Sequence, residues 1–215
     1  MPFTVDQFFD VFGRYNAAIW PLQWVLGAMA IIAVIAVMSA QVSRIRLALI
    51  FVAGLWFWTG AGYHFAFFTR INPAAWLFGS LAIIQGLLLL WAAGKQTAPM
   101  RPRNGLEVSV AATLVFYALI AYPLIGIASG HHYPGAPTFG APCPTTIFTL
   151  GWLCLLSAPP YLLIIPSIWA IIGSFGAFQF GIIQDYAMPL AAILAIVVYL
   201  QPRSGASAST HSFLS

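Results

Sequence analysis

Residues 74–94 read AAWLFGSLAIIQGLLLLWAAG, a continuous apolar stretch without a charged side chain. An α-helix rises about 1.5 Å per residue, so roughly 20 such residues cross the hydrocarbon core of a bilayer. Four other stretches meet this test or come close. A further apolar region, 145–183, is too long for one helix, and Pro159 and Pro160 divide it into two. The sequence therefore predicts an all-α, polytopic transmembrane bundle of about seven spans. The spans outside region 145–183 are 21–40, 47–68, 74–94, 108–127 and 187–200.

The fifth span, Thr145–Ala158, is short. Its length of about 14 residues makes a helix of roughly 21 Å, which is less than the thickness of the hydrocarbon core. It is therefore either a thin or tilted span or one half of a re-entrant pair. Both alternatives leave the C-terminus on the same side of the membrane.

The composition is typical of a protein that is surrounded by lipid. Of its 215 residues, 61% are hydrophobic and 6% are charged, whereas soluble domains carry about 25% charged residues. The formal net charge is +4, but the basic residues stand singly or in pairs beside apolar stretches, so we expect no nucleic-acid binding. We expect one bundle over residues 21–200, with the lipid bilayer as its partner. A second copy or a membrane partner subunit is a further candidate.

The basic residues also predict the orientation. Cytoplasmic loops carry an excess of Lys and Arg, and six of the eight basic residues fall on one side of the predicted topology. The N-terminus is then outside, and residues 201–215 form a disordered cytoplasmic tail. Proline supports the assigned span boundaries, because it is favoured in the first turn of a helix and opens four spans at predicted outer ends. The six residues are Arg44, Arg46, Lys95, Arg101, Arg103 and Arg203, the other two are Arg14 and Arg70, and the prolines are Pro21, Pro73, Pro144 and Pro189.

The N-terminal segment 1–20 has its own amphipathic pattern. Phenylalanines recur at helical spacing, opposite two acidic residues. The pattern predicts a short helix that lies at the membrane interface or packs on the bundle. The residues are Phe3, Phe8, Phe9, Phe12, Asp6 and Asp10.

Polar side chains collect at the predicted outer face, where they indicate a ligand-binding site. His64 is a titratable group near the outer end of the second span, and Asp185 is the one acid near the later spans. We expect Asp185 to form a structural ion pair with Arg70. The ligand-binding candidates are Tyr63, His64, Arg70, His131, His132, Tyr133 and Asp185.

Residues 130–144 form a loop with four prolines and three glycines, a composition that favours an ordered structure. Cys143 stands where the next helix begins, a position that favours a thiolate. Imidazole and thiolate suit zinc or copper, so His131, His132, Cys143 and His64 are candidate metal ligands. The alternative is that these side chains make hydrogen bonds that fasten the loop.

Within the predicted spans, polar side chains need partners. Ser109, Thr113 and Tyr117 are four residues apart and share a helix face, and Gln85 lies on the preceding span. They either line a polar path or make hydrogen bonds between helices. Glycines such as Gly60 predict close helix packing.

Three strings resemble an uncharacterised family of small bacterial multi-pass membrane proteins. They are Tyr63–His64, INPAAWLFG at residues 71–79 and HYPGAPTFGAPCPTTIFTLG at residues 132–151. The resemblance extends over nearly the whole chain. It implies a bacterial inner-membrane location, and members are sometimes labelled permeases, but it brings no catalytic residues.

Three hypotheses for the function remain. The first is a permease-like or solute-binding protein, not an enzyme, whose recognition site lies on the outer face. The second is a metal-dependent membrane enzyme that uses the outer-face His and Cys residues. The third is a structural or accessory membrane subunit. No predicted span contains a lysine, so a retinal Schiff base is excluded.

Overall fold

A computed structural model describes residues 2–97, 104–156 and 158–201. Within these ranges the chain is helical and contains no β-strand, which confirms the predicted all-α class. The elements are α1 (Val5–Ile19), α2 (Leu22–Met38), α3 (Val42–Phe57), η1 (Trp58–Phe65), η2 (Phe68–Arg70), α4 (Ala75–Lys95), α5 (Gly105–Phe116), η3 (Tyr117–Ala121), α6 (Tyr122–Ala128), α7 (Pro142–Leu155), α8 (Tyr161–Phe180), η4 (Ile183–Tyr186) and α9 (Ala187–Leu200).

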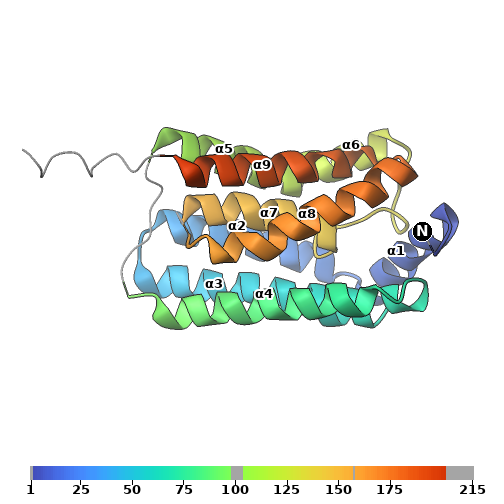
Figure 1. Ribbon diagram of the computed structural model, residues 1–215, viewed down its shortest axis with the longest axis horizontal. Coiled ribbons are helices and arrows are strands. Elements are labelled where there is room, and N and C mark those ends of the chain that lie inside the picture. Colours follow the sequence, from blue (N-terminus) through green and yellow to red (C-terminus); the bar gives the residue numbers. More distant parts are fainter. Residues whose placement is uncertain (1, 98–103, 157, 202–215) are drawn as a thin grey trace, which may run out of the picture.

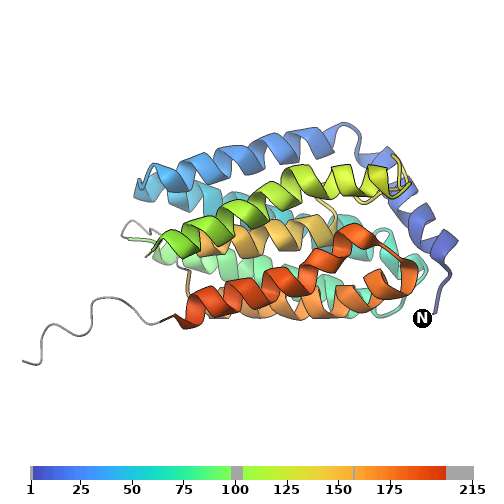
Figure 2. The same ribbon diagram turned by 90° about the horizontal axis from the view of Figure 1, so that it is seen from above.

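The long helices run side by side along one axis, and α1 lies across one end of the bundle (Figure 1). The chain bends by 81° between α1 and α2. The view from above shows that α2 runs along the same side of the bundle as α5 and α6 (Figure 2). We call the end that carries α1 the α1 end and the opposite end the far end.

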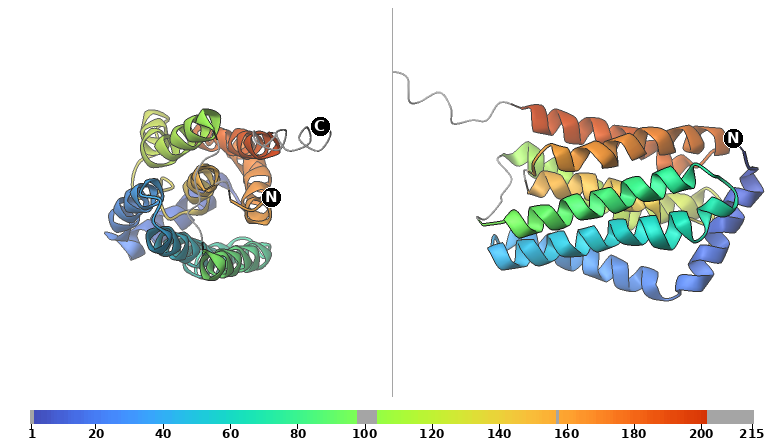
Figure 3. Two further views of the ribbon diagram at one scale, coloured as in Figure 1. Left: turned by 90° about the vertical axis from the view of Figure 1, so that its left-hand side faces the viewer. Right: turned by 60° about the horizontal axis from the view of Figure 1, so that its bottom comes forward.

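Helix α7 occupies the centre of the bundle, with the other helices arranged around it (Figure 3). Every one of its 14 residues is buried. The helix begins at Pro142 and ends at Leu155, earlier at both ends than the predicted span Thr145–Ala158. A helix of this length, about 21 Å, is shielded from the surroundings by protein on all sides.

Among the described residues, five helical segments are long and apolar enough to cross a membrane, and the count rises to six if the bent pair α1–α2 is one span. The predicted seven spans also counted α7, which is shorter than a full crossing. The five segments are Val42–Arg70, Ala75–Lys95, Gly105–Ala128, Tyr161–Phe180 and Ile183–Leu200.

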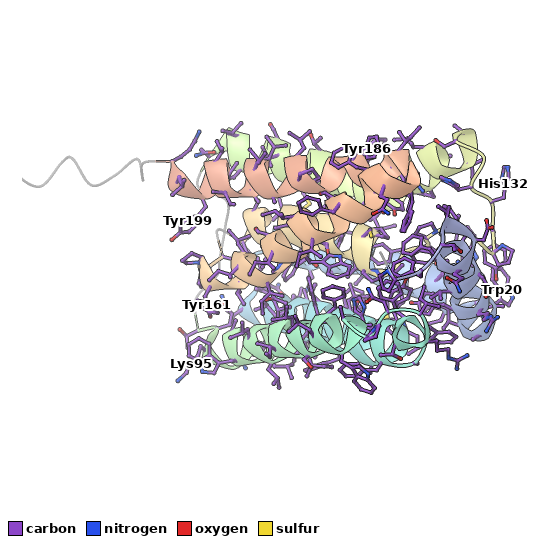
Figure 4. All side chains as sticks on the ribbon, turned by 45° about the vertical axis from the view of Figure 1, so that its right-hand side comes forward. Trp20, Lys95, His132, Tyr161, Tyr186 and Tyr199 are labelled. Carbon is purple, nitrogen blue, oxygen red and sulfur yellow. The ribbon has the colours of Figure 1, made fainter. Side chains whose placement is uncertain are left out.

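The loops divide between the two ends as the sequence predicted. Trp20 and His132 lie at the α1 end, while Lys95, Tyr161 and Tyr199 lie at the far end (Figure 4). By element order, Arg44 and Arg46 belong to the far end, with Lys95, and Arg14 and Arg70 to the α1 end. The other three basic residues, Arg101, Arg103 and Arg203, lie outside the described residues, as does nearly all of the predicted tail 201–215.

Local hydrogen bonds and backbone turns mark the ends of several helices. Thr4 and Gln7 form a capping box at the start of α1, which satisfies two backbone N–H groups. Asn72 accepts a hydrogen bond from the Ala74 N–H at 3.0 Å in the turn before α4. Gly181 ends α8 in the left-handed conformation, with φ at 65°.

Two long helices contain π-helical turns. They are η1, between α3 and η2, and η3, between α5 and α6. A π-helical turn adds a residue to the helical repeat and commonly marks a functional site. Here η1 carries Tyr63 and His64, and η3 begins at Tyr117. Hydrophobic periodicity did not predict either turn.

An aromatic layer attaches α1 to the bundle. Phe8, Phe12 and Tyr15 are buried against residues of η1, η2 and α8. The opposite face of α1 carries Asp10 and Arg14, which form an exposed ion pair at 2.8 Å. The amphipathic pattern of segment 1–20 thus packs its apolar face on the protein.

Candidate functional site

The α6–α7 loop, residues 129–141, is tied to α1 by Asn16. This side chain is fully buried. Its amide nitrogen donates to the carbonyls of Pro134, at 2.6 Å, and Ala136, at 2.7 Å. Its amide oxygen accepts a hydrogen bond from the Thr138 hydroxyl at 2.6 Å. Asn16 therefore fixes the middle of the loop over the α1 end of the bundle.

A second set of hydrogen bonds holds the end of the same loop. The Tyr15 hydroxyl donates to the Gly140 carbonyl at 3.0 Å, and the Trp58 indole N–H donates to that hydroxyl at 2.7 Å. Gly140 has a φ of 97°, which favours glycine. Hydrogen bonds thus fasten this loop, but they come from Tyr15, Asn16 and Trp58 and not from the His and Cys side chains that the sequence singled out.

Asp185 is buried at the α1 end, with 2% of its surface exposed. Its carboxylate accepts hydrogen bonds from the Tyr122 hydroxyl and from the Cys143 thiol. Tyr63, which is also buried, lies close to this cluster. The acid is thus satisfied by neutral donors from α6 and α7.

The expected ion pair between Asp185 and Arg70 is not formed. The Arg70 guanidinium lies over the Phe67 ring, 5.5 Å from its centroid. Burial explains the difference, because Asp185 lies inside the bundle, whereas Arg70 is exposed. Tyr122 and Cys143 reach the carboxylate without bringing a second charge into the apolar interior.

His64 is separated from the other histidines. It is 1% exposed and is surrounded by the rings of Tyr63, Phe68, Phe78 and Trp169. Its Nδ1 atom has no hydrogen-bond partner. A cavity of about 10 Å³ adjoins it, which is close to the volume that one water molecule needs. This setting is consistent with a structural role for His64.

The four predicted metal ligands do not meet. Cys143 donates to Asp185, His64 lies within its aromatic cluster, and His132 is exposed. His131 lies against the Phe9 ring at a centroid distance of 4.8 Å. Among the residues that the structure describes, no group of three or more His, Cys, Asp or Glu side chains is placed to hold a metal ion.

The predicted polar path is not continuous either. Gln85 is buried and donates to the Leu162 carbonyl at 2.9 Å, so it joins α4 to α8. Ser109 and Thr113 are exposed on the outer surface of α5. Tyr117 donates to the Gln184 carbonyl at 2.8 Å. Gln85 and Tyr117 thus make the interhelical hydrogen bonds that were the alternative prediction.

A large groove opens at the α1 end between α2 and α6. Its cavity has a volume of about 970 Å³, which is at the upper end of the range for small-molecule sites. We call it the lateral groove. Helix α2 packs chiefly on α3, whereas α6 packs on η3 and η4, so neither helix fills the space between them. The lining residues are Trp20, Gln23, Trp24, Gly27, Ala28, Ile31, Leu119, Ile120, Tyr122, Pro123, Gly126, Ile127, His131, Tyr133, Ala136, Pro137, Thr138, Phe139 and Gln184.

The lateral groove has a polar end and an apolar end. Gln23, Gln184 and His131 of the α6–α7 loop lie at the α1 end, whereas Ile31 and Leu119 lie further along the helices toward the centre of the bundle. Ile31 is about nine residues beyond the start of α2, a distance of about 14 Å along the helix. The groove therefore has the form of a site for a molecule with a polar head and an apolar tail.

The sequence predicted only part of this site. His131 and Tyr133 were named as ligand-binding candidates, and both line the lateral groove. Gln23 and Gly27 were missed, and Gln184 was not named among the ligand-binding candidates. On α2, the small residues Gly27 and Ala28 beside Trp24 were an available signal, because small side chains leave space between larger ones. The partner face on α6 depends on the packing of distant helices, which periodicity does not reveal.

These features define the class of the protein. It is an all-helical protein whose long apolar helices are compatible with a multi-pass membrane protein. Residues 5–210 match the model of a family of unknown function, DUF6064. The chain belongs to this family. No curated protein and no solved structure matches the chain.

Proposed function

We propose that this protein is a multi-pass membrane protein that binds an amphipathic solute in the lateral groove, with the α1 end outside. The observation that carries the proposal is the cavity of about 970 Å³, with an apolar end between α2 and α6 and a polar end beneath a fastened loop. The solute would enter sideways from the bilayer. This proposal develops the solute-binding hypothesis.

The surroundings of the groove support lateral entry. Trp24 is 72% exposed and Ile31 is 51% exposed on α2, and Ile127 is 54% exposed on α6. In a bilayer these apolar side chains would face the acyl chains. An amphiphile would therefore move from lipid into the groove without crossing a polar barrier, while its head reached the polar end.

Binding is a better proposal than translocation across the membrane. Translocation of a polar solute needs a polar path, and Ser109 and Thr113 lie on the outer surface of α5. The central position of such a path is filled by α7, whose residues are all buried. The observations favour a site that receives and holds a molecule on one side of the bundle.

The test is to fill the groove. Gly27 lines it, and a Cβ atom added there meets no atom within 4 Å. Gly27→Leu should therefore insert a side chain into open space. Native mass spectrometry of the protein in a mild detergent should show a bound amphiphile on the wild type and little on the variant.

Gly54→Leu is the matched control, because Gly54 also has open space around it and lies on α3 outside the groove. This variant should retain the bound amphiphile. Equal occupancy of wild type and Gly27→Leu would contradict the proposal, and so would a wild type that binds nothing after incubation with lipid extract.

A further inference from the structure

We propose that the ligand of the lateral groove is an uncharged bilayer amphiphile whose head group donates hydrogen bonds, of the class of long-chain alcohols and monoacylglycerols. This inference rests on the proposed function and specifies its ligand. Three features of the polar end support it: the absence of formal charge, two amide oxygens without partners, and hydroxyl and imidazole groups that accept and donate.

The first feature is electrical neutrality. Among the described residues that line the groove there is no Asp, Glu, Lys or Arg. Proteins bind phosphate and carboxylate heads mainly with Arg and Lys, and burying an ionised group without a partner is costly. The exposed pair Arg14 and Asp10 on α1 is already neutralised within itself. The groove thus disfavours anionic phospholipids and fatty acids.

The second feature is a pair of unsatisfied acceptors. Gln23 is 7% exposed and Gln184 is 1% exposed, and the side-chain oxygen of each has no hydrogen-bond partner. The Gln23 amide nitrogen donates to the Asn16 carbonyl at 2.8 Å, which determines that its oxygen is the free atom. Buried polar atoms normally have partners.

An amide oxygen accepts hydrogen bonds and cannot donate them. The missing partner must therefore supply an O–H or N–H group. Both glutamines line the groove, and the terminal torsion of glutamine is soft, so a small rotation turns the oxygen toward a bound head. A hydroxyl group meets this requirement, whereas an ether does not.

The third feature is a pair of groups, an imidazole and a hydroxyl, that can donate a hydrogen bond to the oxygen of the same head group. His131 Nδ1 lies 3.5 Å from the Gln184 amide nitrogen, so this contact is at the limit of hydrogen bonding. The Tyr133 hydroxyl lies 3.4 Å from the Asn16 carbonyl, which is also long. Neither group is therefore held by a strong hydrogen bond within the protein.

The experiment compares head groups on one chain. Dodecanol, its methyl ether and dodecyl phosphate are each added to the detergent-purified protein, and bound fractions are measured by native mass spectrometry. Leaving a buried acceptor unsatisfied costs enough that dodecanol should bind about tenfold more tightly than the ether. Dodecyl phosphate should bind more weakly than dodecanol.

Gln184→Met tests the acceptor directly, since methionine keeps an unbranched side chain and removes the amide oxygen. In this variant the ratio of dodecanol affinity to ether affinity should fall toward one. Gln85→Met is the matched control, because Gln85 is also buried with an unpartnered side-chain oxygen but lies outside the groove. This variant should keep the preference. If Gln184→Met does not fold, the ratio of dodecanol affinity to ether affinity measured on the wild type still tests the head-group inference.

The outcomes separate the two proposals. Equal binding of alcohol and ether, or a preference for the phosphate, would overturn the head-group inference and leave the groove as a binding site. Binding of no probe would overturn both proposals. A dimer that excludes every probe would assign the groove to a second copy of the chain and overturn both as well.

Discussion

Asn16 uses both ends of its amide to hold the α6–α7 loop. Three hydrogen bonds join it to Pro134, Ala136 and Thr138, all more than 100 residues away along the chain. A residue in the first helix thereby positions the polar end of the lateral groove. Nothing in the local sequence around Asn16 distinguishes it from a surface asparagine.

Asn16→Ala should destabilise the protein by about 3 kcal/mol, because it removes three hydrogen bonds at a fully buried side chain and leaves the Pro134 and Ala136 carbonyls without this donor. Thermal unfolding in detergent measures the loss, and limited proteolysis should cut the α6–α7 loop sooner. Asn72→Ala is the control, since Asn72 makes one exposed hydrogen bond and should cost about 1 kcal/mol or less. Equal losses would contradict the anchoring role.

The hydrogen-bond partners of Asp185 are determined by its environment as well as by its identity. The sequence marked it as the one acid near the later spans, and its expected partner was Arg70. In the structure, burial selects Tyr122 and Cys143 instead. The choice depends on which side chains the bundle brings to η4, and that is decided by tertiary packing.

At the scale of elements, η1 and α4 approach closely through glycine. A Cβ atom on Gly60 would lie 2.8 Å from the Gly79 carbonyl oxygen, and one on Gly79 would lie 2.2 Å from the Phe65 ring. The predicted role of Gly60 in close helix packing is confirmed. The contact lets the π-helical segment that carries Tyr63 and His64 lie directly on α4.

Gly60→Ala should destabilise the protein by about 1–3 kcal/mol, because the new methyl group meets backbone that cannot move aside cheaply. Gly54→Ala on α3 provides the comparison, since a Cβ atom there meets nothing within 4 Å. It should be neutral or stabilise the helix by up to about 1 kcal/mol. Thermal unfolding of both variants gives the difference, and a neutral Gly60→Ala would refute the close approach.

At the scale of the whole molecule, the two ends differ in charge and in form. The far end carries Arg44, Arg46 and Lys95, and the α1 end carries the loop and the polar end of the groove. The positive-inside rule predicts that the far end faces the cytoplasm. The orientation stays a prediction, and it determines from which leaflet a ligand enters.

Cysteine labelling in intact cells tests the orientation. His132 and Lys95 are exposed at opposite ends (Figure 4), so His132→Cys should react with a membrane-impermeant maleimide and Lys95→Cys should react only after cell lysis. The unmodified chain is the control. Its Cys143 is 6% exposed and its Cys154 is 5% exposed, so both should label slowly. The reverse pattern would place the α1 end inside.

The sequence alone determined the all-α class, the boundaries of most helices and the separation of basic residues between two ends. These properties are local, because hydrophobic length, charge and turn chemistry act within a few residues. The helix boundaries and the positions of the charges follow from whether each segment is stable in lipid or in water.

Tertiary structure alone decided the central position of α7, the partners of Asp185 and the existence of the lateral groove. A groove arises where two helices fail to fill the space between them. Here it depends on the side-chain volumes of α2 and of α6 with the loop that follows it, and α2 is separated from both by more than 80 residues of sequence. Hydrophobic pattern specifies that a face is buried, whereas packing specifies against what it is buried.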